Sequence, residues 1–255
     1  MTQSTQSCES FEWQWTEERV WDSEATLYRK IFEAMGVWHD FYDGKVVADV
    51  GSGMGRFTWA LAHFTKARRI ISVELSPKSV AKQRSYITDP RVEFMNADIA
   101  AVRFTADVIY CAGVIQHTQD PAQTLKNLIG NLNEGGELFV SFYQKTLATR
   151  ALEPLRMVLS RLPRKVLWLL TPLLAPLFMV RKEGRESGFR TAMHTAYDWF
   201  GSHEFQHYFT PAQIDRCFVD AGIHPRNVLK VGRRGPYRAR KGEFPLTLQT
   251  ELMPF

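Results

Sequence analysis

The strongest constraint on the fold of this chain is an apolar run over residues 46–50 that leads into three alternate glycines. A short valine-rich run of this kind predicts a buried strand. Glycine adopts backbone dihedrals that a Cβ forbids and lets the main chain approach a ligand, and the helix expected over 55–64 begins with unpaired N–H groups. The pattern therefore predicts a strand, a ligand-cradling turn and a helix. The acid before the turn is Asp49, and the glycines are Gly51, Gly53 and Gly55.

Two more short apolar runs lead to acids at the expected ends of strands. Residues 70–74 end on Glu74, and residues 92–96 lead to Asp98. In sheets that bind nucleotides, an acid at the end of the second strand is placed to bind a ribose, although the G-x-G-x-G spacing here differs from the G-x-G-x-x-G of dinucleotide folds. Solvated acids that merely close two strands are the alternative.

The expected strands alternate with helices, which are predicted over 79–87 and 122–132. Such alternation is typical of an α/β, doubly wound, mostly parallel sheet with helices on both faces. Ligands of these sheets bind at the carboxyl ends of the strands. Each acid and glycine named above falls at one of those ends, so the sequence predicts one site along that edge.

With these strand ends in place, residues 46–143 resemble the class I S-adenosylmethionine-dependent methyltransferases of the small-molecule type. The resemblance implies a Rossmann-like methyltransferase fold with seven strands, and S-adenosylmethionine as the cofactor. In the family, the glycine loop holds the methionine part of the cofactor and the acid at Glu74 binds both ribose hydroxyls. One departure is Met54, where a small polar residue is common.

The resemblance also implies how the remaining cofactor contacts are distributed. The apolar Leu75 packs on the adenine, Asp98 and Ile99 reach the adenine amino group, and the fourth strand, over 107–113, runs beside the transferred methyl. The implied cofactor-binding residues are Asp49, Gly51, Ser52, Gly53, Gly55, Glu74, Leu75, Asp98, Ile99, Cys111 and Ala112.

Three histidines are candidates for contact with the methyl acceptor. His117 lies in the loop after the fourth strand, which faces the methyl in the family, and His203 and His207 lie in an aromatic stretch. A histidine near its ordinary pKa could accept a proton from a hydroxyl or phenol, although lone histidines are more often structural. A metal held by His203 and His207 needs a helix that Gly201 disfavours, so no metal is expected.

Composition and charge narrow the class of protein. The chain has 255 residues with 45% hydrophobic content, enough for one enzyme domain. Three cysteines without a C-x-x-C pair, and a polar N-terminus, favour a reducing, cytoplasmic location. The net charge of +5 is concentrated in residues 145–190 and 226–241. A basic surface is usually only solvated; an acidic substrate, an anionic membrane or RNA are alternatives, and no nucleic-acid partner is expected because no RNA-binding module is recognisable.

An apolar, basic insertion is expected after the fifth strand, which the turn at 132–140 begins. Within it, residues 166–180 are almost uninterruptedly apolar and have Arg and Lys on both sides. A membrane-spanning helix needs about 20 residues, and Pro172 and Pro176 argue against a continuous helix. We expect a broken helical hairpin that serves as a lid, as a homodimer face or as a peripheral membrane contact. A lid would indicate a small, substantially apolar acceptor.

The predicted organisation has four parts. They are a helical, aromatic cap (1–44), the cofactor-binding core (45–144), the insertion (145–195), and the C-terminal part of the core with a basic tail (196–255). Thr210 and Pro211 predict the start of a helix that runs to Ala221 and stops at Gly222.

The sequence thus predicts an enzyme that transfers a methyl group, of the kind found in secondary metabolism, mainly by proximity and alignment. The acceptor atom could be O, N or C. Two other functions stay open: a non-catalytic S-adenosylmethionine-binding partner subunit, and a nicotinamide-dependent oxidoreductase, which the glycine spacing disfavours.

Overall fold

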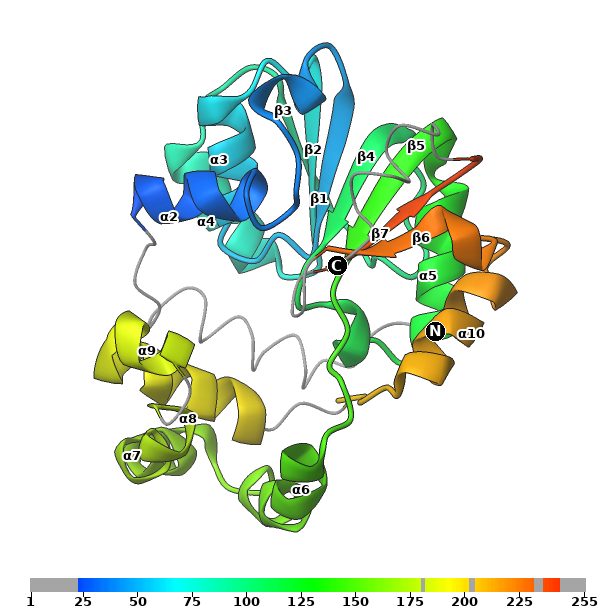
Figure 1. The fold of residues 1–255 in the computed structure, drawn as a ribbon. Coiled ribbons are helices and arrows are strands. Elements are labelled where there is room, and N and C mark those ends of the chain that lie inside the picture. The colour runs from blue at the N-terminus through cyan, green and yellow to red at the C-terminus, as the bar shows by residue number, and fades with distance from the viewer. Residues whose placement is uncertain (1–22, 180–181, 202–204, 232–235, 244–255) are drawn as a thin grey trace.

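The computed structural model describes residues 23–179, 182–201, 205–231 and 236–243. Its centre is a seven-stranded sheet in the order β3-β2-β1-β4-β5-β7-β6 (Figure 1). Strands β1 to β5 pair in parallel, and β7 is antiparallel to both β5 and β6. The predicted doubly wound, mostly parallel sheet is therefore confirmed. The strands are β1 (Val46–Val50), β2 (Arg69–Glu74), β3 (Val92–Asn96), β4 (Ala106–Cys111), β5 (Leu132–Val140), β6 (Val228–Lys230) and β7 (Tyr237–Arg240).

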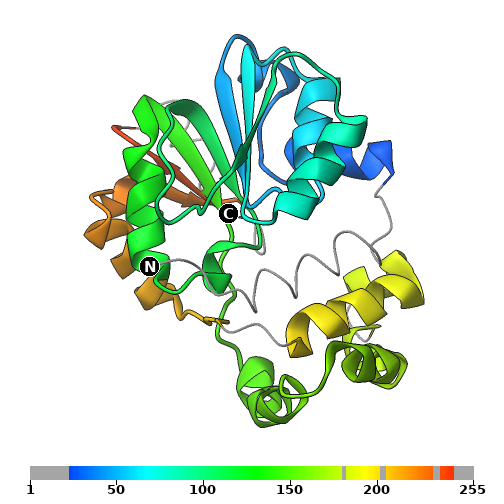
Figure 2. The same cartoon turned by 180° about the vertical axis from the view of Figure 1, so that it is seen from behind.

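Helices cover both faces of the sheet, as Figures 1 and 2 show. One face carries α2 (Glu24–Ile31), α3 (Arg56–Phe64) and α4 (Pro77–Tyr86), and the other carries α5 (Pro121–Gly130) and α10 (Pro211–Asp220). Short 3-10 turns are η2 (His39–Tyr42), η3 (Ile115–His117) and η4 (Pro225–Asn227). The helices expected over 55–64 and 79–87 are confirmed to within two residues at either end.

The helix expected over 122–132 was predicted too long. It ends at Gly130, and Asn131 closes it with its own N–H on the carbonyl of Asn127. Leu132 already belongs to β5, where it lies 2% exposed opposite Ala106. An apolar residue after a helix can end that helix or begin the next strand, and here its burial in the sheet decides.

Strand β1 lies in the middle of the sheet and is buried along its whole length, which is typical of a parallel strand covered on both faces. Alternate side chains point to opposite layers. Val47 packs into the cluster under α2 and α3, whereas Ala48 and Val50 pack into the cluster under α5 and α10. The glycine turn is thus held at the end of a rigid central strand.

Several helices begin with a polar cap followed by proline. The side chains of Ser76, Asp120 and Thr210 each accept a hydrogen bond from a backbone N–H of the first turn, and proline follows each of them. Proline suits the first helical position because it lacks only an N–H that would be unpaired there. The predicted start at Thr210 is confirmed, and Gly222 (φ +87°) follows the helix end.

A separate helical layer follows β5 and lies across the carboxyl ends of the strands (Figures 1 and 2). It consists of α6 (Leu147–Leu159), α7 (Arg164–Leu174), α8 (Pro176–Met179) and α9 (Lys182–Phe200), and we call it the helical layer. The hairpin breaks at Ala175, directly before Pro176. Leu167, Tyr197 and Phe200 are its buried centre.

None of the helices in the described part of the chain is long and apolar enough to cross a bilayer. The cap predicted for 1–44 is described only from residue 23 onward; its aromatic stretch at 11–18 lies outside the described residues.

Candidate functional site

The glycine turn at the end of β1 has the backbone geometry that only glycine adopts readily. Gly51, Gly53 and Gly55 have φ of +69°, +58° and +80°. At Gly51 there is also no room for a side chain, because a Cβ would lie 2.4 Å from Cγ2 of Val114. Val114 belongs to the loop after β4. The two loops that the sequence assigned to the cofactor and to the acceptor therefore touch.

The turn is held to the end of β2 by hydrogen bonds. The N–H groups of Gly51 and Ser52 donate to the carbonyl of Val73 at 2.8 and 3.1 Å. The N–H of Gly53 donates to Oε2 of Glu74 at 2.9 Å, and Oε1 of Glu74 accepts from the N–H of Ser76. Each carboxylate oxygen has two lone pairs, so Glu74 can hold the turn and still accept hydrogen bonds from ligand hydroxyls.

A buried polar network underlies the turn, and sequence analysis did not identify it. Gln83 on α4 donates through Nε2 to the carbonyl of Gly53 at 2.7 Å and to Oγ of Ser52 at 2.9 Å. Its Oε1 accepts from Ser72 of β2 at 2.7 Å. A Cβ at Gly55 would lie 2.8 Å from Cγ of Gln83. The only sequence signal is the presence of polar residues at positions that the helix and strand periods assign to the interior.

Asp49 is buried beneath the turn, where it is 5% exposed. It accepts a hydrogen bond of 2.7 Å from Oγ1 of Thr58 on α3. Burial raises the pKa of Asp49 to about 6, although the bonds to Thr58 and the charge of Arg56 oppose this and Glu74 adds to it. A carboxylate with so little solvent is costly to charge, which is a common sign of a functional site.

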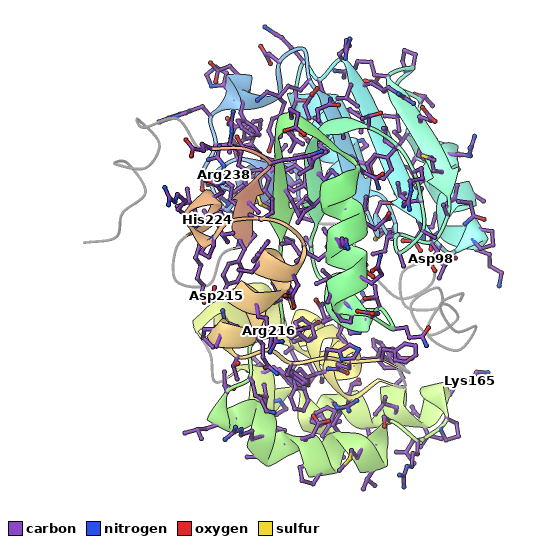
Figure 3. All side chains as sticks on the ribbon, turned by 90° about the vertical axis from the view of Figure 1, so that its right-hand side faces the viewer. Asp98, Lys165, Asp215, Arg216, His224 and Arg238 are labelled. Atoms are coloured by element: carbon purple, nitrogen blue, oxygen red, sulfur yellow. The ribbon has the colours of Figure 1, made fainter. Side chains whose placement is uncertain are left out.

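The residues assigned to the adenine lie at the ends of β2 and β3. Leu75 is half-buried, and its carbonyl accepts from Nδ2 of Asn96 at 2.7 Å. Asp98 accepts from the N–H of Ala100 at 2.9 Å, and Ile99 is buried. Figure 3 shows Asp98 at the end of the sheet that faces the helical layer. The acid and the apolar pair therefore share the carboxyl edge with the glycine turn.

The end of β4 contributes one buried and one exposed residue among those assigned to the cofactor. Cys111 is fully buried, and burial raises the pKa of its thiol to about 12, so it is no nucleophile at neutral pH. The next residue, Ala112, is exposed at the sheet edge. The N–H of Gly113 donates to Oγ of Ser141 at 2.7 Å.

His117 and His207 come together, although they are far apart in the sequence. Nδ1 of His117 lies 3.1 Å from the carbonyl of Phe205, and Nε2 of His207 lies 3.1 Å from the carbonyl of Thr118. A carbonyl only accepts, so Nδ1 of His117 and Nε2 of His207 each carry a proton. Burial lowers the pKa of His117 to about 4, which keeps its ring neutral at physiological pH.

Gln116 is the second residue that sequence analysis missed. Its side chain is fully buried, and within the part of the chain that the structure describes neither Oε1 nor Nε2 has a hydrogen-bond partner. Its backbone carbonyl accepts from the N–H of His207 at 2.9 Å, which fixes the loop. A buried amide without partners costs free energy, so Gln116 is a candidate for a polar contact that the described residues do not supply.

Aromatic side chains form a chain of contacts from this loop to the helical layer. Tyr143 packs edge-to-face on His117 with ring centroids 5.5 Å apart, and it also lies 5.9 Å from Tyr208. Tyr208 in turn lies 6.1 Å from Trp199 of α9 and accepts a hydrogen bond of 2.7 Å from Gln206. The region around His117 is therefore mainly aromatic.

A polar cavity of about 370 Å³ lies at the opposite, amino edge of the sheet. It contains none of the predicted site residues. Glu137 on its wall is bound to Arg238 and, at 3.2 Å, to Arg240, and Asp107 accepts from the N–H of Val46 at 2.8 Å. These ion pairs join β5 to β7, so we do not assign the functional site to this cavity.

Among the described residues, no group of three or more His, Cys, Asp or Glu side chains is arranged to hold a metal ion. His203 lies outside the described residues, so its predicted place beside His207 stays a prediction.

Comparison with known proteins gives a family match for the central part of the chain. A family described as "Methyltransferase domain" matches residues 48–140, from β1 to the end of β5. The ubiquinone biosynthesis O-methyltransferase of Xylella fastidiosa is 25% identical over 203 residues, which cover 77% of this chain and 68% of that protein.

Two further similarities differ in extent. The tRNA U34 carboxymethyltransferase of Campylobacter fetus is 31% identical over 111 residues, which cover only 38% of this chain and 36% of that protein. The magnesium protoporphyrin IX methyltransferase of Synechocystis, solved with bound S-adenosylhomocysteine, has a TM-score of 0.53 at 18% identity and covers 86% of this chain and 83% of that one. At this identity the structural similarity shows the fold.

The glycine turn, the acids at the ends of β2 and β3 and the family match together identify residues 48–140 as a methyltransferase domain with the class I, S-adenosylmethionine-dependent fold. The residues that would bind the cofactor suit it: Gly51, Gly53 and Gly55 give the turn a left-handed backbone, and Glu74 offers a carboxylate to hydroxyls.

Proposed function

We propose that the protein transfers a methyl group from S-adenosylmethionine to a hydroxyl group of a small acceptor with substantial apolar and aromatic surface. The observation that carries this proposal is the contact between the two loops at Gly51 and Val114. It brings the glycine turn, which would bind the cofactor, against the loop that bears Gln116 and His117, which would bind the acceptor.

When bound, S-adenosylmethionine supplies an electrophilic methyl group on a sulfonium. The turn around Gly53, together with Glu74, would hold the cofactor, and Leu75 with Ile99 would enclose its base. Orientation of this kind can lower a barrier by about 7–11 kcal/mol. The protein therefore needs little further chemistry.

His117 would orient the acceptor and receive a hydrogen bond at Nε2. With a pKa of about 4 the ring is a weak base, better suited to aligning a hydroxyl than to holding a proton at neutral pH. Gln116 would donate or accept through its unpartnered amide. His207 would keep the loop in place through the carbonyl of Thr118.

Apolar character of the acceptor follows from the aromatic side chains of Tyr143, Trp199 and Tyr208 near His117. The inner side of the helical layer would act as the lid, since it lies over the carboxyl edge. Similarity to the ubiquinone-pathway enzyme extends over 77% of the chain and so includes more than the cofactor half. Similarity to the tRNA-modifying enzyme covers only 38%, which gives an RNA acceptor less support.

The first test is thermal unfolding with and without S-adenosylmethionine and S-adenosylhomocysteine. A ligand at 100 times its dissociation constant adds about 2.7 kcal/mol of stability. We expect both to raise the melting temperature. Well-folded protein that responds to neither at millimolar ligand, but responds to NADH, would favour an oxidoreductase.

The second test is incubation with labelled cofactor and a panel of lipophilic phenols, alcohols and amines. Labelled product from phenols or alcohols alone supports the proposal. Cofactor binding without any labelled product, also in cell extract, would favour the non-catalytic partner subunit. The predicted cytoplasmic location and role in secondary metabolism stay predictions.

A further inference from the structure

The outer side of the helical layer exposes an unusual amount of apolar surface. Large hydrophobic side chains on α6, α7 and α8 are between 40% and 84% exposed, and α6 has no buried residue. Monomeric proteins rarely show contiguous apolar patches of this kind without a partner. We call these residues the apolar outer face: Leu147, Leu155, Met157, Val158, Val166, Leu169, Leu173 and Leu177.

Helix α7 shows that the exposure follows the helical period. Leu167 and Thr171 are at most 1% exposed and point into the layer, whereas Leu169 and Leu173 are 75% and 77% exposed. A helix that only covered a core would carry polar residues on its outer side. Here both sides of α7 are apolar, so we expect the exposed side to be covered by another apolar surface.

The charges around this face are almost all positive. Between residues 145 and 179 the sequence contains a single acid, Glu153, which is bound to Arg156 at 2.6 Å. Arg150, Arg161 and Lys165 are exposed, and Figure 3 shows Lys165 pointing outward from the layer. An apolar stripe edged by cations is the pattern of helices that lie in the interface of an anionic membrane.

We propose that the apolar outer face binds peripherally to an anionic lipid bilayer. A second copy of the chain is the weaker occupant. A two-fold dimer brings the same surface together twice, so Arg150, Arg161 and Lys165 would face like charges, and between residues 145 and 179 the one acid, Glu153, is already bound to Arg156. Phospholipid headgroups supply the missing negative charge, and acyl chains cover the leucines.

This inference goes beyond the proposed methyl transfer and does not depend on it. The helical layer lies between the outer face and the carboxyl edge of the sheet (Figure 1). Binding would therefore leave the amino edge of the sheet in water.

The test is co-sedimentation of the full chain with vesicles of phosphatidylcholine, with and without phosphatidylglycerol, at two salt concentrations. We expect binding only to the anionic vesicles and weaker binding at high salt. Leu169→Glu and Leu173→Glu should each weaken binding by about tenfold or more, because a charge replaces an inserted leucine. Val219→Glu is the matched control, since Val219 on α10 is 51% exposed but outside the face.

A second pair of variants tests the charges. Arg161→Gln with Lys165→Gln should lower anionic binding, whereas Lys66→Gln with Arg68→Gln removes the same charge elsewhere on the surface and should not. A thermal shift with S-adenosylhomocysteine, unchanged in every variant, shows that they fold and separates this proposal from the methyl-transfer site.

Three results would overturn the inference. The first is a wild-type chain that binds neither kind of vesicle, and the second is equal binding by all variants. The third is a dimer, found by light scattering, that Leu169→Glu dissociates, which would assign the face to a second copy.

Discussion

The cofactor turn and the helical layer lie on two sides of the same sheet edge and differ in how they are held. Around the turn, Asp49, Ser72 and Gln83 are buried and hydrogen-bonded. Asp49 accepts from Thr58, Ser72 donates to Gln83, and Gln83 donates to the carbonyl of Gly53. Among the described residues of the helical layer, the buried hydrophobic cluster centres on Leu167, Tyr197 and Phe200, and large apolar side chains on α6, α7 and α8 are exposed. The turn is fixed by hydrogen bonds within the protein, whereas the helical layer presents exposed apolar side chains that a partner surface can cover.

The same division appears among relatives. The match to the tRNA-modifying enzyme covers 38% of the chain and the matched domain ends at residue 140, before the helical layer begins. A ligand common to a family can be bound by one local arrangement, while the acceptor is chosen by elements added to it. We therefore expect variants of the turn to affect cofactor binding and variants of the layer to affect stability or partners.

The largest effect is expected from Gly51→Ala. The new methyl group would lie 2.4 Å from Val114 in a backbone with φ +69°. Either the turn or the loop after β4 must move, so affinity for S-adenosylhomocysteine should fall by about 100-fold or more, which calorimetry would measure.

Gly44→Ala is the matched control. Gly44 has nearly the same φ of +70°, but a Cβ there meets nothing within 4 Å. Its backbone strain should cost about 1 kcal/mol of stability and leave affinity unchanged. If both variants bind alike, close packing at Gly51 does not matter for the cofactor.

Asp49→Asn should stabilise the protein without ligand and weaken cofactor binding, by less than Gly51→Ala does. Because the folded pKa of about 6 lies above the ordinary 3.8, the folded protein binds more protons between these values, and stability falls as pH rises through them. The asparagine can still accept from Thr58 and carries no charge. We expect a gain of up to about 3 kcal/mol at pH 7 and none near pH 3.5.

Denaturant unfolding at the two pH values would measure this gain. A variant that is less stable than the wild type at pH 7 would show that Asp49 contributes more through its contacts than its burial costs.

Much of the turn could be predicted because its determinants are local. Alternate glycines after a valine run specify the backbone, and Glu74 follows a second run of the same kind. The role of Gln83 could not be predicted, because it depends on how α4 packs against β2. Gln116 was missed for a similar reason: a glutamine is unremarkable in a loop until its burial is known.

The helical layer was predicted only in outline. Its prolines indicated a broken hairpin, but which side of each helix is covered depends on α9. The exposure of Leu169 beside the burial of Leu167 could not be derived from a segment that is apolar all round.

Leu167→Ala and Leu169→Ala therefore form a matched pair on one helix. Leu167 is 1% exposed, and its truncation should cost about 2 kcal/mol, the low end for a core leucine because its cluster is small. Leu169 is 75% exposed, and its truncation should change stability by less than about 0.5 kcal/mol. Calorimetric unfolding would measure both, and equal losses would contradict the assignment of an inner and an outer side.

Among the variants of the site, the smallest effect is expected from His117→Gln. Affinity for S-adenosylhomocysteine should be unchanged, and turnover should fall by about tenfold, less than for a full general base, because alignment rather than proton transfer is lost. Above the titration of Asp49, whose pKa is about 6, the wild-type rate should stay flat between about pH 7 and 8, since the pKa of His117 is about 4.

The free energy of unfolding of the wild type and of the His117→Gln variant should differ increasingly as the pH is lowered. The folded pKa of His117 lies below the ordinary 6.5, so the unfolded chain binds the proton first and the wild type loses stability as pH falls from about 6.5 toward 4. The glutamine variant lacks this loss. If instead the wild-type rate falls below pH 7 with a step that His117→Gln removes, His117 titrates near neutrality in the complex and acts as a proton acceptor.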